Sequence, residues 1–152
     1  MNKIAFEELY MQQLPGLFRL AQSILRQPAD AEDAVHQAVL QAWQQIDTIQ
    51  SGKEKAYLAR IIINECHNIQ RKRQRTVPVP DFPDRAVPKN ELVDLRDAVD
   101  RLPEKLRLPL VLCYSEGMSY EEAADVLRIP ASTLRGRLRR GKDALRKELS
   151  AE

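Results

Sequence analysis

The segment from Ser132 to Lys147, STLRGRLRRGKDALRK, holds seven basic residues and one acid, Asp143. Its leucines recur at helical spacing, which places them on one side of a helix and most of the basic residues on the other. These leucines, with the next one along the chain, are Leu134, Leu138, Leu145 and Leu149. The planar guanidinium of arginine can donate two hydrogen bonds to O6 and N7 of guanine, and it can also bind phosphate. The spacing therefore predicts a helix whose basic face enters the major groove of DNA.

The segment before this helix predicts a shorter helix and a turn. Ser119 and Glu122 have the spacing of a capping box, in which each side chain accepts a hydrogen bond from the backbone N–H of the other residue. Pro130 ends the short helix, because proline has no N–H and disfavours helical geometry in the preceding Ile129. A capped helix, a turn and a basic helix are the parts of a helix-turn-helix. For the basic run alone, a helix face exposed to water would be the simpler interpretation.

A differently built basic helix is expected between residues 56 and 73. Its apolar stripe consists of Leu58, Ile62, Cys66 and Ile69. The opposite face carries Arg60, Asn64, His67 and Arg71. The stripe is too long for a strand, although the run of three isoleucines alone would fit one. The basic end at residues 71–75 also fits a helix end that is simply exposed to water.

Two amphipathic helices or helix pairs are expected nearer the N-terminus. The first covers residues 4–27 and ends at Pro28, and Asp30 is expected to cap the second. The core stripe of the second helix is Val35, Val39, Ala42, Trp43 and Ile46. Leu40 lies off this stripe, which makes it a candidate contact with another protein. A loop is expected over residues 47–55.

Composition predicts an all-α chain of two small helical domains. Its 152 residues are 43% hydrophobic and only 5% aromatic, and few stretches alternate as strands do. Residues 76–90 hold four of the nine prolines and no glycine, which is typical of an extended, stiff linker. The formal charge is +2 over residues 1–75, −3 over 76–100 and +3 over 101–152. Two basic ends and an acidic middle favour nucleic acid as a partner.

The sequence does not support an enzyme. Gly136, Gly141 and Lys142 match part of a phosphate-binding loop, but Asp143 replaces the required Ser or Thr and no strand precedes the segment. No nucleophile, base and orienting group can be assembled, so no catalytic residue is assigned. The two histidines and two cysteines lack metal-site spacing, so we expect no metal, no cofactor and no structural disulfide. No signal peptide or apolar run of about 18 residues is recognised, which predicts a cytoplasmic protein without membrane insertion.

These parts, in this order, resemble the extracytoplasmic-function sigma factors, the minimal bacterial transcription initiation subunits of the sigma-70 family. Residues 30–43, DAEDAVHQAVLQAW, resemble the polymerase-binding helix of that family, and residues 56–73, AYLARIIINECHNIQRKR, resemble its −10 promoter helix. Residues 102–145 resemble its −35 reader. The chain departs from the usual family pattern at His36, Gln37, Val39, Tyr57, Asn68 and Gly136.

The resemblance implies a domain at residues 1–75 that binds core polymerase and the −10 element, a linker at 76–92, and a −35-binding helix-turn-helix domain at 93–152. It implies that the chain binds the β′ and β subunits of core RNA polymerase, directs the enzyme to promoter DNA and aids melting without nucleotide hydrolysis. An anti-sigma factor is a further implied partner. No small-molecule substrate is expected.

Each implied surface corresponds to one set of residues. The −35 set is Thr133, Arg135, Gly136, Arg137, Arg139, Arg140 and Lys142. Within it, base edges are expected to face Arg135, Gly136, Arg139 and Arg140, and phosphates the remaining three. The −10 set is Tyr57, Arg60, Ile61, Asn64, His67, Asn68 and Arg71. The polymerase set is Asp30, Glu32, Asp33, Gln37, Leu40, Gln41 and Gln44.

Two other functions remain open from the residues alone. A helix-turn-helix regulator would use the first 75 residues for dimerisation or ligand binding and would recognise palindromic DNA without polymerase. A helical adaptor would bind proteins through the acidic face of residues 30–44 and would bind DNA only in a salt-sensitive, sequence-independent manner.

Overall fold

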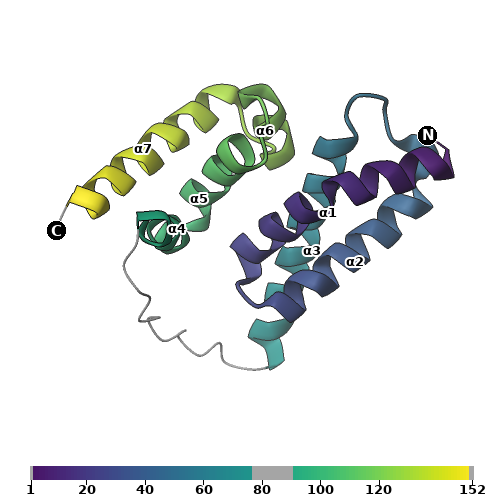
Figure 1. Cartoon of the computed structure of the whole chain (residues 1–152), viewed down its shortest axis with the longest axis horizontal. Coiled ribbons are helices and arrows are strands. Elements are labelled where there is room, and N and C mark those ends of the chain that lie inside the picture. Colours follow the sequence, from purple (N-terminus) through teal and green to yellow (C-terminus); the bar gives the residue numbers. More distant parts are fainter. Residues whose placement is uncertain (1, 77–90, 151–152) are drawn as a thin grey trace. The chain divides into compact units, whose positions relative to one another are not determined.

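The computed structural model describes residues 2–76 and 91–150, and no strand occurs within these ranges. The helices, shown in Figure 1, are α1 (Lys3–Leu25), α2 (Pro28–Gln44), α3 (Glu54–Thr76), α4 (Glu91–Arg101), α5 (Glu104–Leu110), α6 (Tyr120–Leu127) and α7 (Ala131–Ser150), with a 3₁₀-helix η1 (Ile46–Thr48) and a π-helical turn η2 (Val111–Ser115). One compact unit contains α1 to α3, and a second contains α4, α5, η2, α7 and the first part of α6. The all-α fold with two helical units confirms the predicted fold class. The predicted linker falls mostly outside the described residues.

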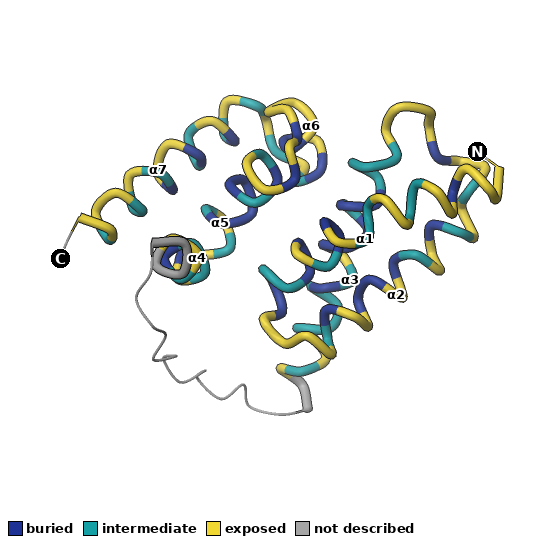
Figure 2. Tube along the Cα trace, in the orientation of Figure 1, coloured by how far each residue is buried: buried dark blue, intermediate teal, exposed yellow. Residues whose placement is uncertain are grey.

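The first unit is a bundle in which α1, α2 and α3 each pack against the other two. Figure 2 shows buried positions recurring along all three helices. Its largest fully buried side chains are Leu20, Leu58, Ile62 and Cys66. The buried face of α2 consists mainly of alanines, whose small side chains allow the neighbouring helices to approach closely. The predicted stripe of α3 is thus confirmed except at Ile69, which is half-buried.

The start of α2 differs from the prediction. The helix begins at Pro28, a position where the missing N–H of proline leaves no helical hydrogen bond unmade. Gln27 therefore occupies the cap position, and the expectation that Asp30 caps the helix is wrong. Asp30 lies in the first turn instead, and its carboxylate forms an ion pair with Arg73 near the end of α3.

In the second unit, α7 packs against α4 and α5. Leu134 and Leu138 are buried, as the leucine spacing predicts, but Leu145 is half-buried and Leu149 is 43% exposed. The predicted stripe is therefore wrong at its end, because Leu149 lies in the last turn of α7. The guanidinium of Arg107, itself buried, donates a 2.6 Å hydrogen bond to the carbonyl of Leu102 and so helps to close the end of α4.

Pro109 lies inside α5, which is followed at once by the π-helical turn η2. Proline has no N–H, so the helical hydrogen bond to the carbonyl four residues earlier cannot form. After the proline the helix widens, and the N–H of Glu116 donates to the carbonyl of Val111, five residues earlier, at 2.9 Å. A π-helical turn changes the direction in which the following side chains point. Tyr114 lies within this turn and is 56% exposed.

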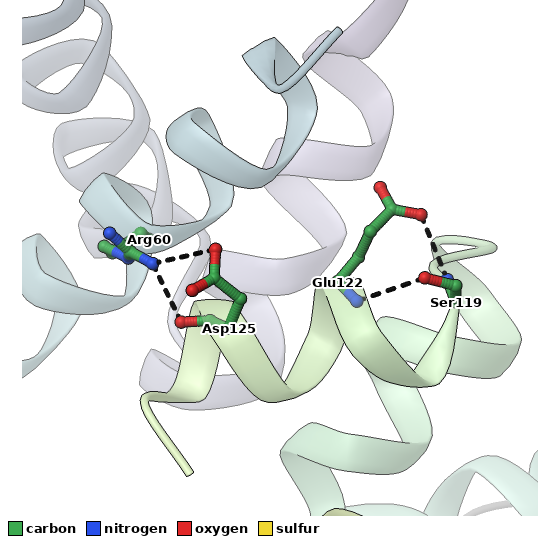
Figure 3. A network of polar contacts seen from close by, with 4 residues as sticks. All are labelled: Arg60, Ser119, Glu122 and Asp125. Carbon is green, nitrogen blue, oxygen red and sulfur yellow. Dashed lines mark hydrogen bonds and ion pairs between the residues drawn. The ribbon is translucent and has the colours of Figure 1, made fainter. Parts of the chain in front are cut away.

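The capping box that opens α6 is present. Figure 3 shows the N–H of Glu122 donating to Ser119 Oγ at 3.1 Å and the N–H of Ser119 donating to Glu122 Oε1 at 3.3 Å. Just before it, Gly117 adopts a left-handed φ of 67°, which a residue with a side chain rarely adopts. The predicted start of a helix at Ser119 is confirmed.

Replacing Ser119 by alanine is expected to destabilise the second unit by about 1 kcal/mol, because one N–H at the start of α6 loses its partner. Thermal unfolding followed by circular dichroism measures this loss. Ser132→Ala is the matched control, since Ser132 is exposed in the first turn of α7 and is expected to change the stability by less than about 0.5 kcal/mol. Equal losses in the two variants would contradict a stabilising role for the capping box.

Candidate nucleic-acid interface

The basic side chains of α7 lie on the side of the helix that faces away from its core contacts. Leu134, Leu138 and Gly141 are buried on the core side. Of the predicted −35 set, the exposed members are Arg135, Arg139 and Arg140, and the half-buried members are Thr133, Gly136, Arg137 and Lys142. Burial of the leucine face therefore leaves the guanidinium groups accessible to DNA.

Four basic residues follow one another along α7 at steps of four, three and four. This cationic row consists of Arg135, Arg139, Lys142 and Arg146. The row lines a cavity of about 350 Å³ together with Tyr120 and one acid, Asp143. The Asp143 carboxylate lies 4.0 Å from the Arg146 guanidinium and offsets part of the charge at that end. The remaining positive charge suits the cavity to a phosphate.

Lys142 contacts Tyr114 beside this cavity, and Tyr120 lies next to Tyr114. Its ammonium nitrogen lies 4.8 Å from the centre of the Tyr114 ring, within the range of a cation–π interaction. A hydrogen bond between Lys142 and the phenol oxygen of Tyr114 lowers the pKa of Tyr114 and raises the pKa of Lys142. A second hydrogen bond joins Tyr120 to Tyr114 and raises the pKa of Tyr120. The three side chains therefore form one polar cluster.

The predicted −10 set lies along α3. Asn64 and Arg71 are exposed, and Arg71 donates a hydrogen bond to the side-chain oxygen of Asn68. The half-buried members are Tyr57, Arg60, His67 and Asn68. Ile61 is the exception, because it is only 7% exposed and belongs to the core of the first unit. Its predicted contact with a DNA base is therefore corrected to a packing role.

The predicted polymerase set lies on the outer face of α2. Its exposed members are Glu32, Asp33, Gln37, Leu40, Gln41 and Gln44. Leu40 is 46% exposed, which confirms that it lies off the core stripe. Asp30 is less accessible than the others because it is half-buried and paired with Arg73.

Three residues beside the basic face were missed by sequence reasoning. Arg146 continues the row of α7 and could have been found from its spacing of four residues from Lys142. Tyr120 lines the same cavity from the start of α6. Tyr114 could not have been found, because its direction depends on the π-helical turn after Pro109.

The chain matches two family models in the expected order. Sigma-70 region 2 matches residues 9–76, and sigma-70 region 4 matches residues 92–145. Together with relatives at 30% identity or more over most of their length, these matches show that the chain belongs to the extracytoplasmic-function sigma factors of the sigma-70 family, transcription factors that direct RNA polymerase to promoters.

The similar proteins come from several bacteria. The RNA polymerase sigma-E factor of Streptomyces coelicolor is 31% identical, with 97% of this chain and 88% of that protein covered. The ECF RNA polymerase sigma factor SigE of Mycolicibacterium smegmatis is also 31% identical, and the match covers 96% of this chain but only 62% of that protein. The chain thus spans less than two thirds of the SigE length.

Two solved structures share the fold. The sigma factor RpoE of Bartonella quintana, in complex with the anti-sigma factor NepR, matches with a TM-score of 0.80 and 26% identity over 97% of this chain and 98% of that one. CnrH, in complex with the cytosolic domain of CnrY, matches with a TM-score of 0.77 and 26% identity over 99% of this chain and 91% of that one. Within the described residues, no helix combines the length and apolar composition of a membrane span.

Proposed function

We propose that this chain binds core RNA polymerase through the outer face of α2, captures bases of the −10 element with α3 and reads the −35 element with α7. The observation that carries the proposal is the position of the arginines on α7, exposed opposite a buried face of Leu134, Leu138 and Gly141. Such a helix can enter a major groove without disturbing the core that holds it. The capping box before α6 supports the helix-turn-helix that presents it.

The chemistry of α3 suits a single strand better than a duplex. Asn64 offers an amide at the surface, Tyr57 offers an aromatic face for stacking, and Arg71 offers a charge for the backbone. Unpairing a base costs a few kcal/mol, and stacking plus hydrogen bonds to the captured base offset that cost. This balance is why we propose that opening of the DNA needs no nucleotide hydrolysis.

The outer face of α2 is suited to a protein partner. It carries two carboxylates, Glu32 and Asp33, near the positive end of the helix, and one exposed apolar side chain, Leu40. We propose that this face contacts the β′ subunit and that the second unit contacts the β subunit. The domain boundaries proposed for these tasks are residues 1–75 and 93–152, with the linker at 76–92.

Membership of the family suggests a further partner, a location in the cell and the absence of an enzymatic activity. The matched RpoE structure contains an anti-sigma factor, and we propose that a comparable inhibitor binds this chain. We also propose that the chain acts in the cytoplasm, where core polymerase and promoter DNA are found, and that it has no enzymatic activity of its own.

The division of tasks predicts that Asn64→Ala slows promoter opening about tenfold while leaving the initial binding of the duplex within about twofold. The physical reason is that Asn64 would contact a base only after that base leaves the stack. Permanganate reactivity of unpaired thymines measures opening, and a competitor challenge at low temperature measures initial binding, both with the holoenzyme.

Gln74→Ala is the matched control, because Gln74 is an exposed amide on the same helix and lies outside the −10 set. It is expected to leave both measurements unchanged. A loss of initial binding by Asn64→Ala, with normal opening of the complexes that form, would contradict the task assigned to α3.

A further inference from the structure

The two tyrosines near Lys142 are exposed aromatic side chains of the second unit. Tyr114 is 56% exposed and Tyr120 is 41% exposed. They come from different elements, since Tyr114 lies in η2 and Tyr120 begins α6. Tyr114 lies at the ammonium group of Lys142 in α7, and Tyr120 is joined to Tyr114. The cluster therefore joins η2, α6 and α7 at the surface of the second unit.

The partners of Lys142 leave its charge intact. The Tyr114 oxygen is a neutral acceptor, and the Tyr114 ring attracts the ammonium through its negative face. A carboxylate in the same place would neutralise the charge, as Asp143 does in part for Arg146. An ammonium has three donors, so a hydrogen bond to Tyr114 leaves donors for a further acceptor.

We propose that Tyr114 and Tyr120 are positioning residues, which hold the Lys142 ammonium at the edge of the cationic cavity so that it meets a backbone phosphate of promoter DNA. The flexible side chain of lysine has about 2 kcal/mol of rotamer entropy to lose when it is fixed. The tyrosines fix it before DNA arrives, so less of that entropy is lost on binding. The inference rests on the proposed contact of α7 with the −35 element.

The test uses holoenzyme and a duplex that carries the −35 segment of a promoter which the unaltered holoenzyme uses. Lys142→Gln is expected to weaken binding about tenfold and to reduce the slope of log affinity against log salt by about 0.9, the value of one phosphate contact. Tyr114→Leu is expected to weaken binding about threefold with the slope unchanged, because the charge remains but is no longer held in place. Tyr114→Phe keeps the aromatic ring and is expected to lose less DNA affinity than Tyr114→Leu.

The coupling between the effects of Tyr114→Leu and Lys142→Gln on affinity tests the inference. In the Lys142→Gln background, Tyr114→Leu is expected to change affinity by less than about 1.5-fold, because there is no ammonium left to position. Lys147→Gln is the control for charge alone, since Lys147 is exposed on α7 but does not line the cavity. An undiminished effect of Tyr114→Leu in the double variant would overturn the inference, as would an unchanged slope in Lys142→Gln.

Ultraviolet titration of the tyrosines gives a second readout that needs no DNA. The hydrogen bond with Lys142 holds the pKa of Tyr114 below its usual value, so Tyr114 should ionise at a lower pH than it does without the ammonium. Lys142→Gln should move this step to higher pH, and no movement would overturn the cluster itself. Failure of the unaltered holoenzyme to bind the duplex would instead overturn the proposed function, and the inference with it.

Discussion

Replacing Arg139 by alanine is expected to weaken binding of the holoenzyme to a promoter with an intact −35 element by about tenfold to a hundredfold. Arg139 is exposed in the middle of the cationic row, on the side of α7 opposite the buried leucines. A guanidinium at such a place can pair with one guanine through two hydrogen bonds, and losing a good pair of this kind costs about 1–3 kcal/mol of discrimination. Equilibrium binding to duplexes with intact and scrambled −35 segments measures the effect.

Binding to the scrambled duplex shows whether Arg139 contacts a specific base or only adds positive charge that attracts any DNA. If Arg139 reads a base, the variant and the unaltered protein should bind the scrambled duplex with affinities within about threefold of each other. Lys147→Ala removes a charge two turns further along α7 and is expected to weaken binding to both duplexes equally and slightly. Equal losses on both duplexes for Arg139→Ala would assign Arg139 to a phosphate and contradict its role as a base reader.

Replacing Gly141 by leucine is expected to destabilise the second unit by about 1–3 kcal/mol or more, whereas the same change at Gly136 is expected to stabilise it by up to about 0.8 kcal/mol. A Cβ at Gly141 would lie 3.1 Å from Leu110 Cδ1 and 3.4 Å from the carbonyl oxygen of Leu106, so a larger side chain must push α7 away from α5. A Cβ at Gly136 would meet only the Arg140 guanidinium, at 3.9 Å. That distance is an ordinary van der Waals contact, and leucine has a higher helix propensity than glycine.

Denaturant unfolding of the two variants measures the difference, and both glycines lie on the same helix. Circular dichroism before unfolding checks that helix content is retained. A Gly141→Leu variant as stable as the unaltered protein would contradict the close approach of α5 and α7, and a Gly136→Leu variant that is strongly destabilised would contradict the open surroundings of Gly136.

The fold was predictable where helical spacing and capping act locally. The burial of Leu134 and Leu138 in α7, the α3 stripe from Leu58 to Cys66 and the Ser119–Glu122 capping box follow from residues within a few turns of one another. These patterns were enough to place the cationic face of α7 outside the core. They also placed Leu40 at the surface of α2 before any packing was known.

The partner of Asp30, the burial of Ile61 and the position of Tyr114 depend on residues that are distant in sequence or on backbone geometry, whereas Leu149 is exposed because it lies in the last turn of α7. Asp30 pairs with Arg73, more than 40 residues away, and this partner could not be read from the start of α2. Ile61 directly follows Arg60, a residue of the predicted polar face of α3. The packing of α3 against α1 and α2 nevertheless buries Ile61. Tyr114 lies in the π-helical turn after Pro109, where its ring is 4.8 Å from the Lys142 ammonium, and a regular helix was expected there from the sequence.

The measurement that tests the account most directly is transcription in vitro with purified core polymerase, this chain and a library of random promoters, scored by mapping start sites. The account predicts new start sites that require the chain and share two sequence elements at a fixed separation. It also predicts that Arg139→Ala selects against the upstream element and that Asn64→Ala lowers opening at the downstream one. No new start sites with core polymerase, together with protection of a palindromic sequence by the chain alone, would contradict it.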